Sequence, residues 1–196
     1  MENTPAIETE RLILRRFTEN DAEALFQILS DTEVNTFLPM FPLKSMEEAK
    51  RYLKERYLDQ YRKPDGYHYA VCRKEDSVPI GYVNVSDDDS HDFGYGLRKE
   101  FWHCGMITEA SRAVVQRLRD SGIPYLTATH DVNNPRSGAV MKKIGMAYRY
   151  SYEEQWQPKD LLVTFRMYQL NFTKPQDWVY RKYWDQYPVH FVEENV

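Results

Sequence analysis

The clearest chemical pattern lies between Gly94 and Ala110, where a glycine-containing strand leads through a short loop into a helix. Gly105 stands at the start of that helix, and glycine lets the backbone approach a ligand closely. The first amides of a helix lack carbonyl partners and lie at the positive end of its dipole, so this position favours an anion such as a pyrophosphate. The alternative is an ordinary connection that uses a small residue for steric reasons.

A second pattern begins at Asn134, which is followed by a proline and, three residues later, by Ser137. Asparagine is a good helix N-cap, and proline suits the first helical position. Gly145 suits the end of the same helix. Residues three apart share a helix face, so Asn134 and Ser137 can reach the same ligand.

Other reactive residues have simpler interpretations. His103 and Cys104 adjoin the loop, but a cysteine nucleophile needs a neighbouring base and an accessible thiolate, so packing or loop contacts are the simpler role. The five histidines show no metal-ligand spacing, and we predict no metal. The acidic run 87–89 either attracts a cationic substrate or forms a solvated turn.

Composition restricts the partners. The net charge of the 196 residues is −4, and the basic residues form no stripe, which argues against nucleic acid as a partner. Residues 1–7 lack the features of a signal peptide, and no apolar run is long enough to span a membrane. Two distant cysteines, Cys72 and Cys104, indicate no disulfide framework. These features predict a cytoplasmic protein without a membrane partner.

Periodicity and turn signals predict an α/β fold with a mixed sheet of about seven strands and four main helices. Capping-box patterns begin the first two helices, at Thr18 and Ser45. The predicted strands are 11–17, 67–73, 79–86, 92–98, 124–131, 147–155 and 161–170, and the predicted helices begin near residues 19, 45, 106 and 135.

Together the motifs resemble the GNAT superfamily of acetyltransferases, and most closely its ribosomal-protein N-terminal acetyltransferase-like (RimJ/RimL-type) branch. The opening strand Thr9-Glu-Arg-Leu-Ile-Leu-Arg15 and the central strand Phe93-Gly-Tyr-Gly-Leu97 are similar to that branch. Phe101-Trp-His-Cys-Gly-Met-Ile-Thr-Glu-Ala110 resembles its coenzyme A loop and helix, and Asn134 to Met146 its later helix. The resemblance covers residues 9–170.

The resemblance implies a GNAT acyl-CoA N-acyltransferase domain over residues 1–170. It implies transfer of an acetyl group from acetyl-CoA to a primary amine, either a protein N-terminus or a small molecule. Acetyl-CoA is expected between two splayed central strands, with its pantetheine arm pairing to backbone near residues 95–99. The implied cofactor-binding residues are Tyr95, Leu97, Arg98, Lys99, Trp102, His103, Cys104, Gly105, Met106, Ile107, Thr108, Asn134, Ser137 and Lys143.

Two departures affect this interpretation. Ile107 places a branched side chain where the family's pyrophosphate loop usually has a small one, and Met141 occupies the position of the tyrosine that serves as general acid in many members. Ser137 is then predicted to act as the general acid, or to orient a water that does, for the departing CoA thiolate. The departures also support an alternative, a catalytically weakened CoA-binding sensor or interaction module.

For the general base, the branch directs attention to Glu153 and Glu154 in the strand after the second motif. Adjacent strand residues point to opposite faces, so at most one of them faces the reaction centre. Asp92, on a central strand, is the reserve candidate.

Residues 171–196 form a tail rich in aromatic side chains that is too short to be a domain. Exposing so many rings to water is unfavourable, so we expect this C-terminal extension to pack on the domain or on a second subunit, which favours a homodimer. Its rings include Trp178, Tyr180, Tyr183, Trp184, Tyr187 and Phe191.

Overall fold

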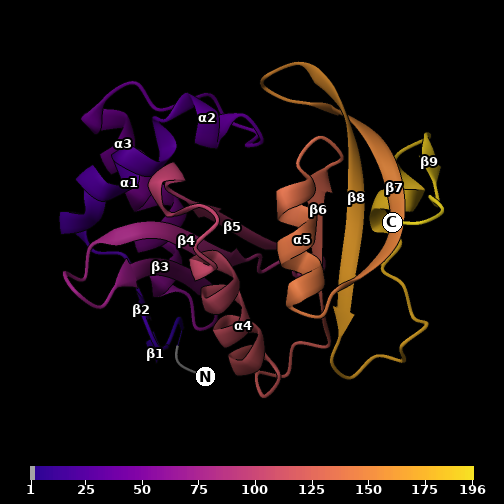
Figure 1. The fold of residues 1–196 in the computed structure, drawn as a ribbon, viewed down its shortest axis with the longest axis horizontal. Helices are drawn as coiled ribbons and strands as arrows, with labels where there is room; N and C mark the ends of the chain where they lie inside the picture. Colours follow the sequence, from indigo (N-terminus) through magenta and orange to yellow (C-terminus); the bar gives the residue numbers. More distant parts are fainter. Residues whose placement is uncertain (1–2) are drawn as a thin grey trace.

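Two antiparallel sheets meet where β5 runs beside β6 in the computed structural model, which describes residues 3–196 (Figure 1). The first sheet has the order β1-β2-β3-β4-β5 and the second the order β6-β8-β7-β9. Their strands are β1 (Ile7–Glu8), β2 (Leu12–Arg15), β3 (Tyr67–Arg73), β4 (Pro79–Val85), β5 (Phe93–Leu97), β6 (Tyr125–Asp131), β7 (Ala147–Trp156), β8 (Leu161–Asn171) and β9 (His190–Phe191).

A single parallel bridge, between Asp92 and Thr127, joins the two sheets within the described part of the chain. The Thr127 amide donates to the His91 carbonyl at 3.4 Å, and no further β5–β6 ladder pairs follow along residues 93–97. The predicted mixed α/β architecture is therefore confirmed, with β1 and β9 as additional two-residue strands. We call the boundary between β5 and β6 the seam.

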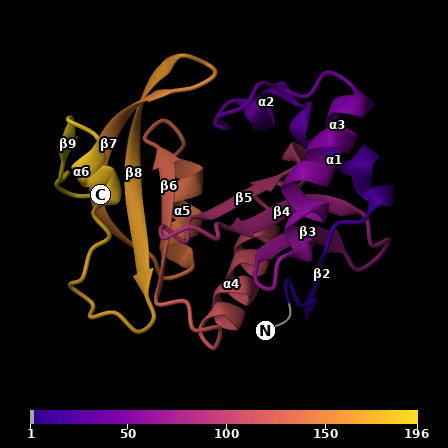
Figure 2. The ribbon, with the colours of Figure 1, turned by 180° about the vertical axis from the view of Figure 1, so that it is seen from behind.

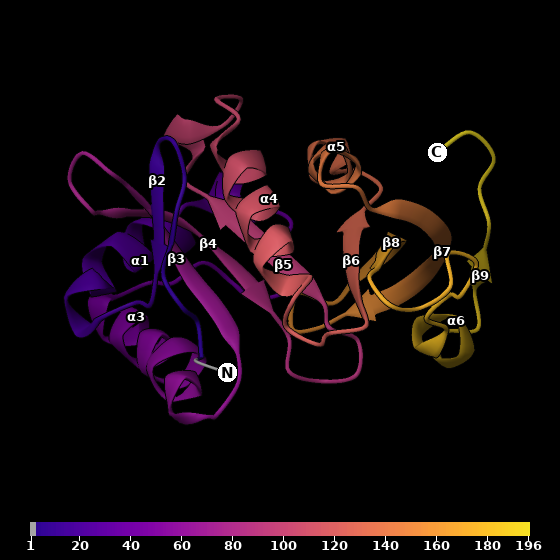
Figure 3. The same ribbon diagram turned by 90° about the horizontal axis from the view of Figure 1, so that it is seen from below.

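The helices are α1 (Ala22–Leu29), α2 (Thr32–Asn35), α3 (Met46–Leu53), α4 (Met106–Leu118), α5 (Pro135–Lys143) and α6 (Lys182–Gln186). Viewed from below, α4 and α5 lie over one face of the sheets, and α1, α3 and α6 lie on the other (Figure 3). Instead of continuing as α-helix, α3 passes into a π-helical turn (Lys54–Leu58) and a 3-10 turn (Gln60–Arg62).

Local signals define the helix starts as expected. Thr18 and Asp21 form a capping box, and the Ser45 hydroxyl accepts from the Glu48 amide at 3.2 Å. Asn134 caps α5 through its side chain, which accepts from the Ser137 amide at 3.4 Å. These caps satisfy amides that have no partner inside the helix.

The core is divided by the sheets. Leu14, Val71 and Phe93 pack with residues of α4 and α5 in the largest cluster, whereas Ala70 and Cys72 pack with α1 and α3 on the opposite face. The alternation along β3 follows the two-residue period of a strand, and burial on both faces explains its continuous apolar sequence.

The C-terminal extension packs on the second sheet of its own chain, on the face away from α5 (Figures 2 and 3). β9 pairs antiparallel with β7, placing Phe191 opposite Ser151. The chain then continues past this edge, and Glu193 accepts from Ser151 Oγ at 2.5 Å and from Arg166. No helix in residues 3–196 is long and apolar enough to cross a membrane.

Candidate functional site

The start of α4 has the geometry expected of an anion site. Gly105 is its N-cap with φ +76°, a left-handed conformation that favours glycine, and His103 just before it has φ +62°. No side chain caps this helix end. The amides of Met106, Ile107 and Thr108 therefore have no partner within the helix and remain available to a ligand.

The loop before α4 is held from two sides. The Trp102 indole Nε1 donates to the Leu97 carbonyl at 2.8 Å, which ties the loop to the end of β5. Arg11, in the turn between β1 and β2, donates to the Cys104 carbonyl at 2.9 Å and forms a 2.6 Å ion pair with Glu109. These contacts fix the loop geometry without occupying the first amides of α4.

A pocket of about 650 Å³ opens beside this helix end. The cations that line it come from three elements: Arg11, Arg112 on α4 and Lys143 at the end of α5. The lining residues are Thr9, Glu10, Arg11, Gly105, Thr108, Glu109, Arg112 and Lys143.

Sequence reasoning found Gly105, Thr108 and Lys143 but missed Arg11 and Arg112. Arg112 lies two helical turns after Gly105, a spacing that could have revealed it. Nothing local marks Arg11, because it reaches the loop from the opposite end of the domain sequence.

Two predicted cofactor residues have their side chains elsewhere. Lys99 pairs with Asp31 at 2.9 Å and Arg98 with Glu100 at 3.0 Å, and both line a separate pocket of about 260 Å³ near the end of α1. Only their backbone is left for the predicted contact with the pantetheine arm, because these side chains are engaged with carboxylates.

Ser137, the predicted general acid, is bound to Tyr95. The Tyr95 hydroxyl lies 2.7 Å from the Ser137 carbonyl oxygen and 2.9 Å from Ser137 Oγ. A carbonyl only accepts, so the phenol proton goes to it, and the serine hydroxyl then donates to Tyr95 Oη. The pair links β5 to α5 across the seam, and burial raises the pKa of Tyr95.

Asp92 lies at the bridged end of the seam. Its Oδ1 is shielded from solvent and has no hydrogen-bond partner, although the residue as a whole is half-buried. Burial, reinforced by the nearby Asp88 charge, raises its pKa to about 7. A Cβ placed on Gly94, two residues further along the strand, would meet nothing within 4 Å, so there is open space beside this carboxylate.

The two glutamates of β7 differ in their surroundings. Glu154 shares a strand face with Tyr152 and lies near the Tyr187 hydroxyl, and burial raises its pKa. Glu153 lies opposite Thr164 on the other face. The sequence predicted that they would diverge, and Glu154 is the one that faces the extension.

The remaining candidates have mainly structural contacts. Met141 is buried in the main core, Cys72 is buried and Cys104 is exposed, with its thiol 3.3 Å from the Trp102 carbonyl oxygen. No group of three or more metal-ligating side chains that could hold an ion occurs among residues 3–196.

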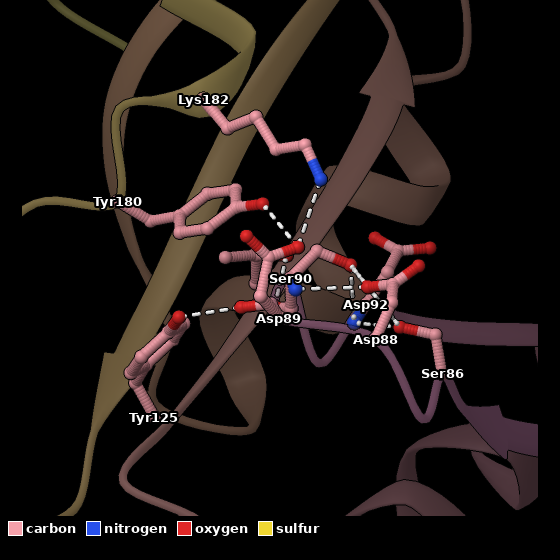
Figure 4. A network of polar contacts seen from close by, with 9 residues as sticks. Ser86, Asp88, Asp89, Ser90, Asp92, Tyr125, Tyr180 and Lys182 are labelled. Carbon is pink, nitrogen blue, oxygen red and sulfur yellow. Dashed lines mark hydrogen bonds and ion pairs between the residues drawn. The ribbon is translucent and has the colours of Figure 1, made fainter.

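The acidic run 87–89 is engaged by protein groups, and Figure 4 shows the contacts of Asp88 and Asp89. Asp87 pairs with Lys63 at 2.6 Å, and Asp89 with Lys182 of the extension at 2.9 Å. Asp88 accepts from the Ser90 amide at 2.8 Å. These bonds give the run a structural role in shaping the turn before Asp92.

Known proteins share this arrangement. A family model described as an acetyltransferase (GNAT) domain matches residues 11–147. The chain belongs to the GNAT acetyltransferase family. As a GNAT protein it is an acyl-CoA-dependent acetyltransferase, as the sequence resemblance predicted.

Among curated relatives, this GNAT chain is 27% identical over 146 residues to the uncharacterized N-acetyltransferase YoaA of Bacillus subtilis, covering 72% of this chain and 82% of YoaA. It is 30% identical over 122 residues to the uncharacterized N-acetyltransferase p20 of Bacillus licheniformis, covering 60% and 66% of the two chains.

Solved structures show the same fold. A GNAT-family acetyltransferase from Bacillus anthracis superposes with a TM-score of 0.74 at 19% identity, covering 87% of this chain and 100% of the other. RimL, a ribosomal L7/L12 alpha-N-protein acetyltransferase solved with coenzyme A, superposes with a TM-score of 0.73 at 17% identity, covering 86% and 99%. These likenesses show that the chain shares the fold of both structures.

Proposed function

We propose that this protein transfers the acetyl group of acetyl-CoA to a primary amine, which is either a protein N-terminus or a small-molecule amine. One observation supports this most: a phosphate-compatible helix end lies at one end of the seam, and a carboxylate with a raised pKa lies at the other. The two halves of the reaction, donor binding and proton removal, are thus assigned to opposite ends of one structural feature.

For donor binding, the amides at the start of α4 would hold the pyrophosphate, while Arg112 and Lys143 would neutralise its charge. The arrangement fits such a ligand because the helix end is uncapped and three cations line the adjoining pocket. Bound there, acetyl-CoA would supply a thioester carbonyl as the acyl donor. Asn134 and the β5 backbone are the proposed contacts for the pantetheine arm.

For proton removal, Asp92 has stronger support than Glu153 or Glu154. An attacking amine must lose a proton, and a base works best when its pKa lies near the working pH. Asp92 has a pKa of about 7 and lies beside the open space above Gly94. Glu154 lies near the Tyr187 hydroxyl of the extension, and Glu153 lies on the opposite face of β7.

For the leaving group, Ser137 remains the proposed proton donor, with Tyr95 holding its hydroxyl in place. The Ser137 hydroxyl is hydrogen-bonded to Tyr95 Oη, so it must rotate to serve a departing thiolate. The Tyr95 hydroxyl bonded to the Ser137 carbonyl keeps α5 at a fixed distance from β5 during that rotation.

The test is a panel of amines assayed by release of free CoA thiol. The panel contains peptides with free and blocked N-termini, a polyamine, an aminoglycoside and single amino acids, each at several concentrations. We expect amine-dependent thiol release that saturates with at least one class. Tight acetyl-CoA binding without amine-dependent release from any class would instead support the sensor or interaction module.

A further inference from the structure

We propose that the C-terminal extension is part of the catalytic centre, with Tyr183 covering Asp92 and Lys182 holding the loop that precedes it. Both are positioning residues, because they act through Asp92. The inference rests on the proposed function in one respect: it assumes that Asp92 is the general base.

The loop that carries Asp92 is a built structure (Figure 4). Asp88 Oδ1 accepts from the Ser90 amide at 2.8 Å and from Ser86 Oγ at 3.1 Å. Ser86 Oγ in turn accepts from the Asp92 amide at 2.8 Å. The backbone of Asp92 is therefore fixed by side chains of its own loop.

The second sheet holds this loop from across the seam. Thr127 Oγ1 donates to the Ser90 carbonyl at 2.9 Å, and the Tyr125 hydroxyl donates to the Asp89 carbonyl at 2.5 Å. Both donors come from β6, so the loop and β6 move together at this end of the seam.

The extension adds a third hold. Lys182 Nζ and the Tyr180 hydroxyl both donate to Asp89 Oδ1, at 2.9 and 3.3 Å. Tyr180 is itself anchored, because its amide donates to Gln169 Oε1 of β8 at 2.9 Å. Asp89 thus connects the loop of the first sheet to a segment that is fixed on the second.

Tyr183 brings the extension to the catalytic carboxylate. Its ring stacks on Tyr152 with centroids 5.3 Å apart and an interplanar angle of 20°. Its hydroxyl lies near Ser90 and Thr127, on the two sides of the seam. The charge of Asp92 acts on the hydroxyls of both Tyr183 and Tyr152.

Burial, reinforced by the Asp88 carboxylate on its own loop, explains the raised pKa of Asp92. The phenols of Tyr95, Tyr152 and Tyr183, from β5, β7 and the extension, lie within range of its charge. No cation is among these groups, so desolvation and the Asp88 charge are not offset. Removing the Tyr183 ring would admit water and lower the pKa of Asp92.

The experiment measures the Asp92 pKa directly in the full-length, ligand-free protein, by NMR of ¹³C-labelled aspartate carboxyls assigned by comparison with Asp92→Asn. Tyr183→Ala, Tyr183→Phe and Lys182→Met are compared with Lys174→Met, a control in the same extension whose side chain lies against Trp178. Each variant is also assayed for kcat against pH and for acetyl-CoA affinity by calorimetry.

We expect Tyr183→Ala to lower the Asp92 pKa by a unit or more and kcat at pH 7 by about tenfold, with acetyl-CoA affinity unchanged. Tyr183→Phe keeps the ring and should cause a smaller shift, Lys182→Met should lower kcat a few-fold, and Lys174→Met should match the wild type. An unchanged Asp92 pKa in folded Tyr183→Ala overturns the proposal. A wild-type kcat in Asp92→Asn would reject Asp92 as the base. This outcome differs from an unchanged Asp92 pKa in Tyr183→Ala, which would reject only the proposed role of Tyr183.

Discussion

The two ends of the seam have opposite electrostatic environments. At the α4 end, three cations and uncapped amides surround an accessible pocket, which suits a ligand that brings its own negative charge. At the Asp92 end, burial and the Asp88 charge raise the pKa of a carboxylate, and no cation offsets them. Cations strengthen the binding of a phosphate-bearing ligand, but a cation beside a carboxylate lowers its pKa and makes it a weaker base. A site that needs both functions therefore benefits from placing them at different positions along a strand.

Asp92→Asn should have the largest effect, because it removes the proposed base and leaves the phosphate end of the seam unchanged. Loss of a general base lowers kcat by about 10²–10⁴-fold, because the amide cannot accept the amine proton. Acetyl-CoA affinity should stay at the wild-type value, since the phosphate end is untouched. Steady-state kinetics and calorimetry provide the two readings, and a parallel loss of affinity would contradict the separation of the two ends.

The same variant should show that the Asp92 environment costs stability. The folded pKa of about 7 exceeds the ordinary aspartate value of 3.8, so the folded state binds more protons between these pH values. Stability therefore falls as pH rises from about 4 to 7 and stays low above it. We compare the free energy of unfolding of Asp92→Asn with that of the wild type at pH 4 and at pH 8. The difference should shift in favour of the variant by on the order of a few kcal/mol between these pH values. Denaturant unfolding at both pH values measures this, and an equal difference at both would refute it.

At the other end, Gly105→Val should raise the acetyl-CoA Kd about tenfold. The left-handed conformation costs a residue with a Cβ about 1–2 kcal/mol, and relaxing it turns the amides away from the ligand. Gly105→Asn is the matched control, because asparagine tolerates this conformation. Calorimetry on protein with native circular dichroism decides, and equal affinities of the valine and asparagine variants would show that the conformation is unimportant.

A smaller effect separates charge from geometry at the same end. Arg112→Ala should weaken acetyl-CoA binding by about three- to tenfold at low salt, and the difference should shrink as salt screens the phosphates. Arg117→Ala, an exposed arginine further along α4, is the control. Titrations at two ionic strengths measure both, and identical behaviour of the two variants would remove Arg112 from the proposed binding set.

The sequence predicted features that depend on local pattern. The seven main strands, the caps at Thr18, Ser45 and Asn134, and Gly105 at the start of α4 all follow from periodicity or from contacts a few residues apart. The two-residue strands β1 and β9 are too short for a periodic signal and exist through pairing with neighbours.

The environment of the candidate base was beyond such patterns. Asp92 interacts electrostatically with Tyr152 and Tyr183, which lie 60 and 91 residues further along the chain. Nothing in the residues around Asp92 signals that burial, and it therefore ranked below the two glutamates of β7. The bond between Tyr95 and Ser137, 42 residues apart, escaped prediction for the same reason.

The path of the extension around β7 also bears on how these molecules behave at high concentration. An unpaired strand edge is a template on which another chain can add a strand, leading to aggregation. Here β9 occupies the edge of β7 at Ser151 and Tyr152, and Glu193 fastens the chain beyond it to Ser151 and Arg166. The segment proposed to cover Asp92 thus also caps the sheet, so truncating it would leave an unpaired β-strand edge and an uncovered row of aromatic rings on the same molecule.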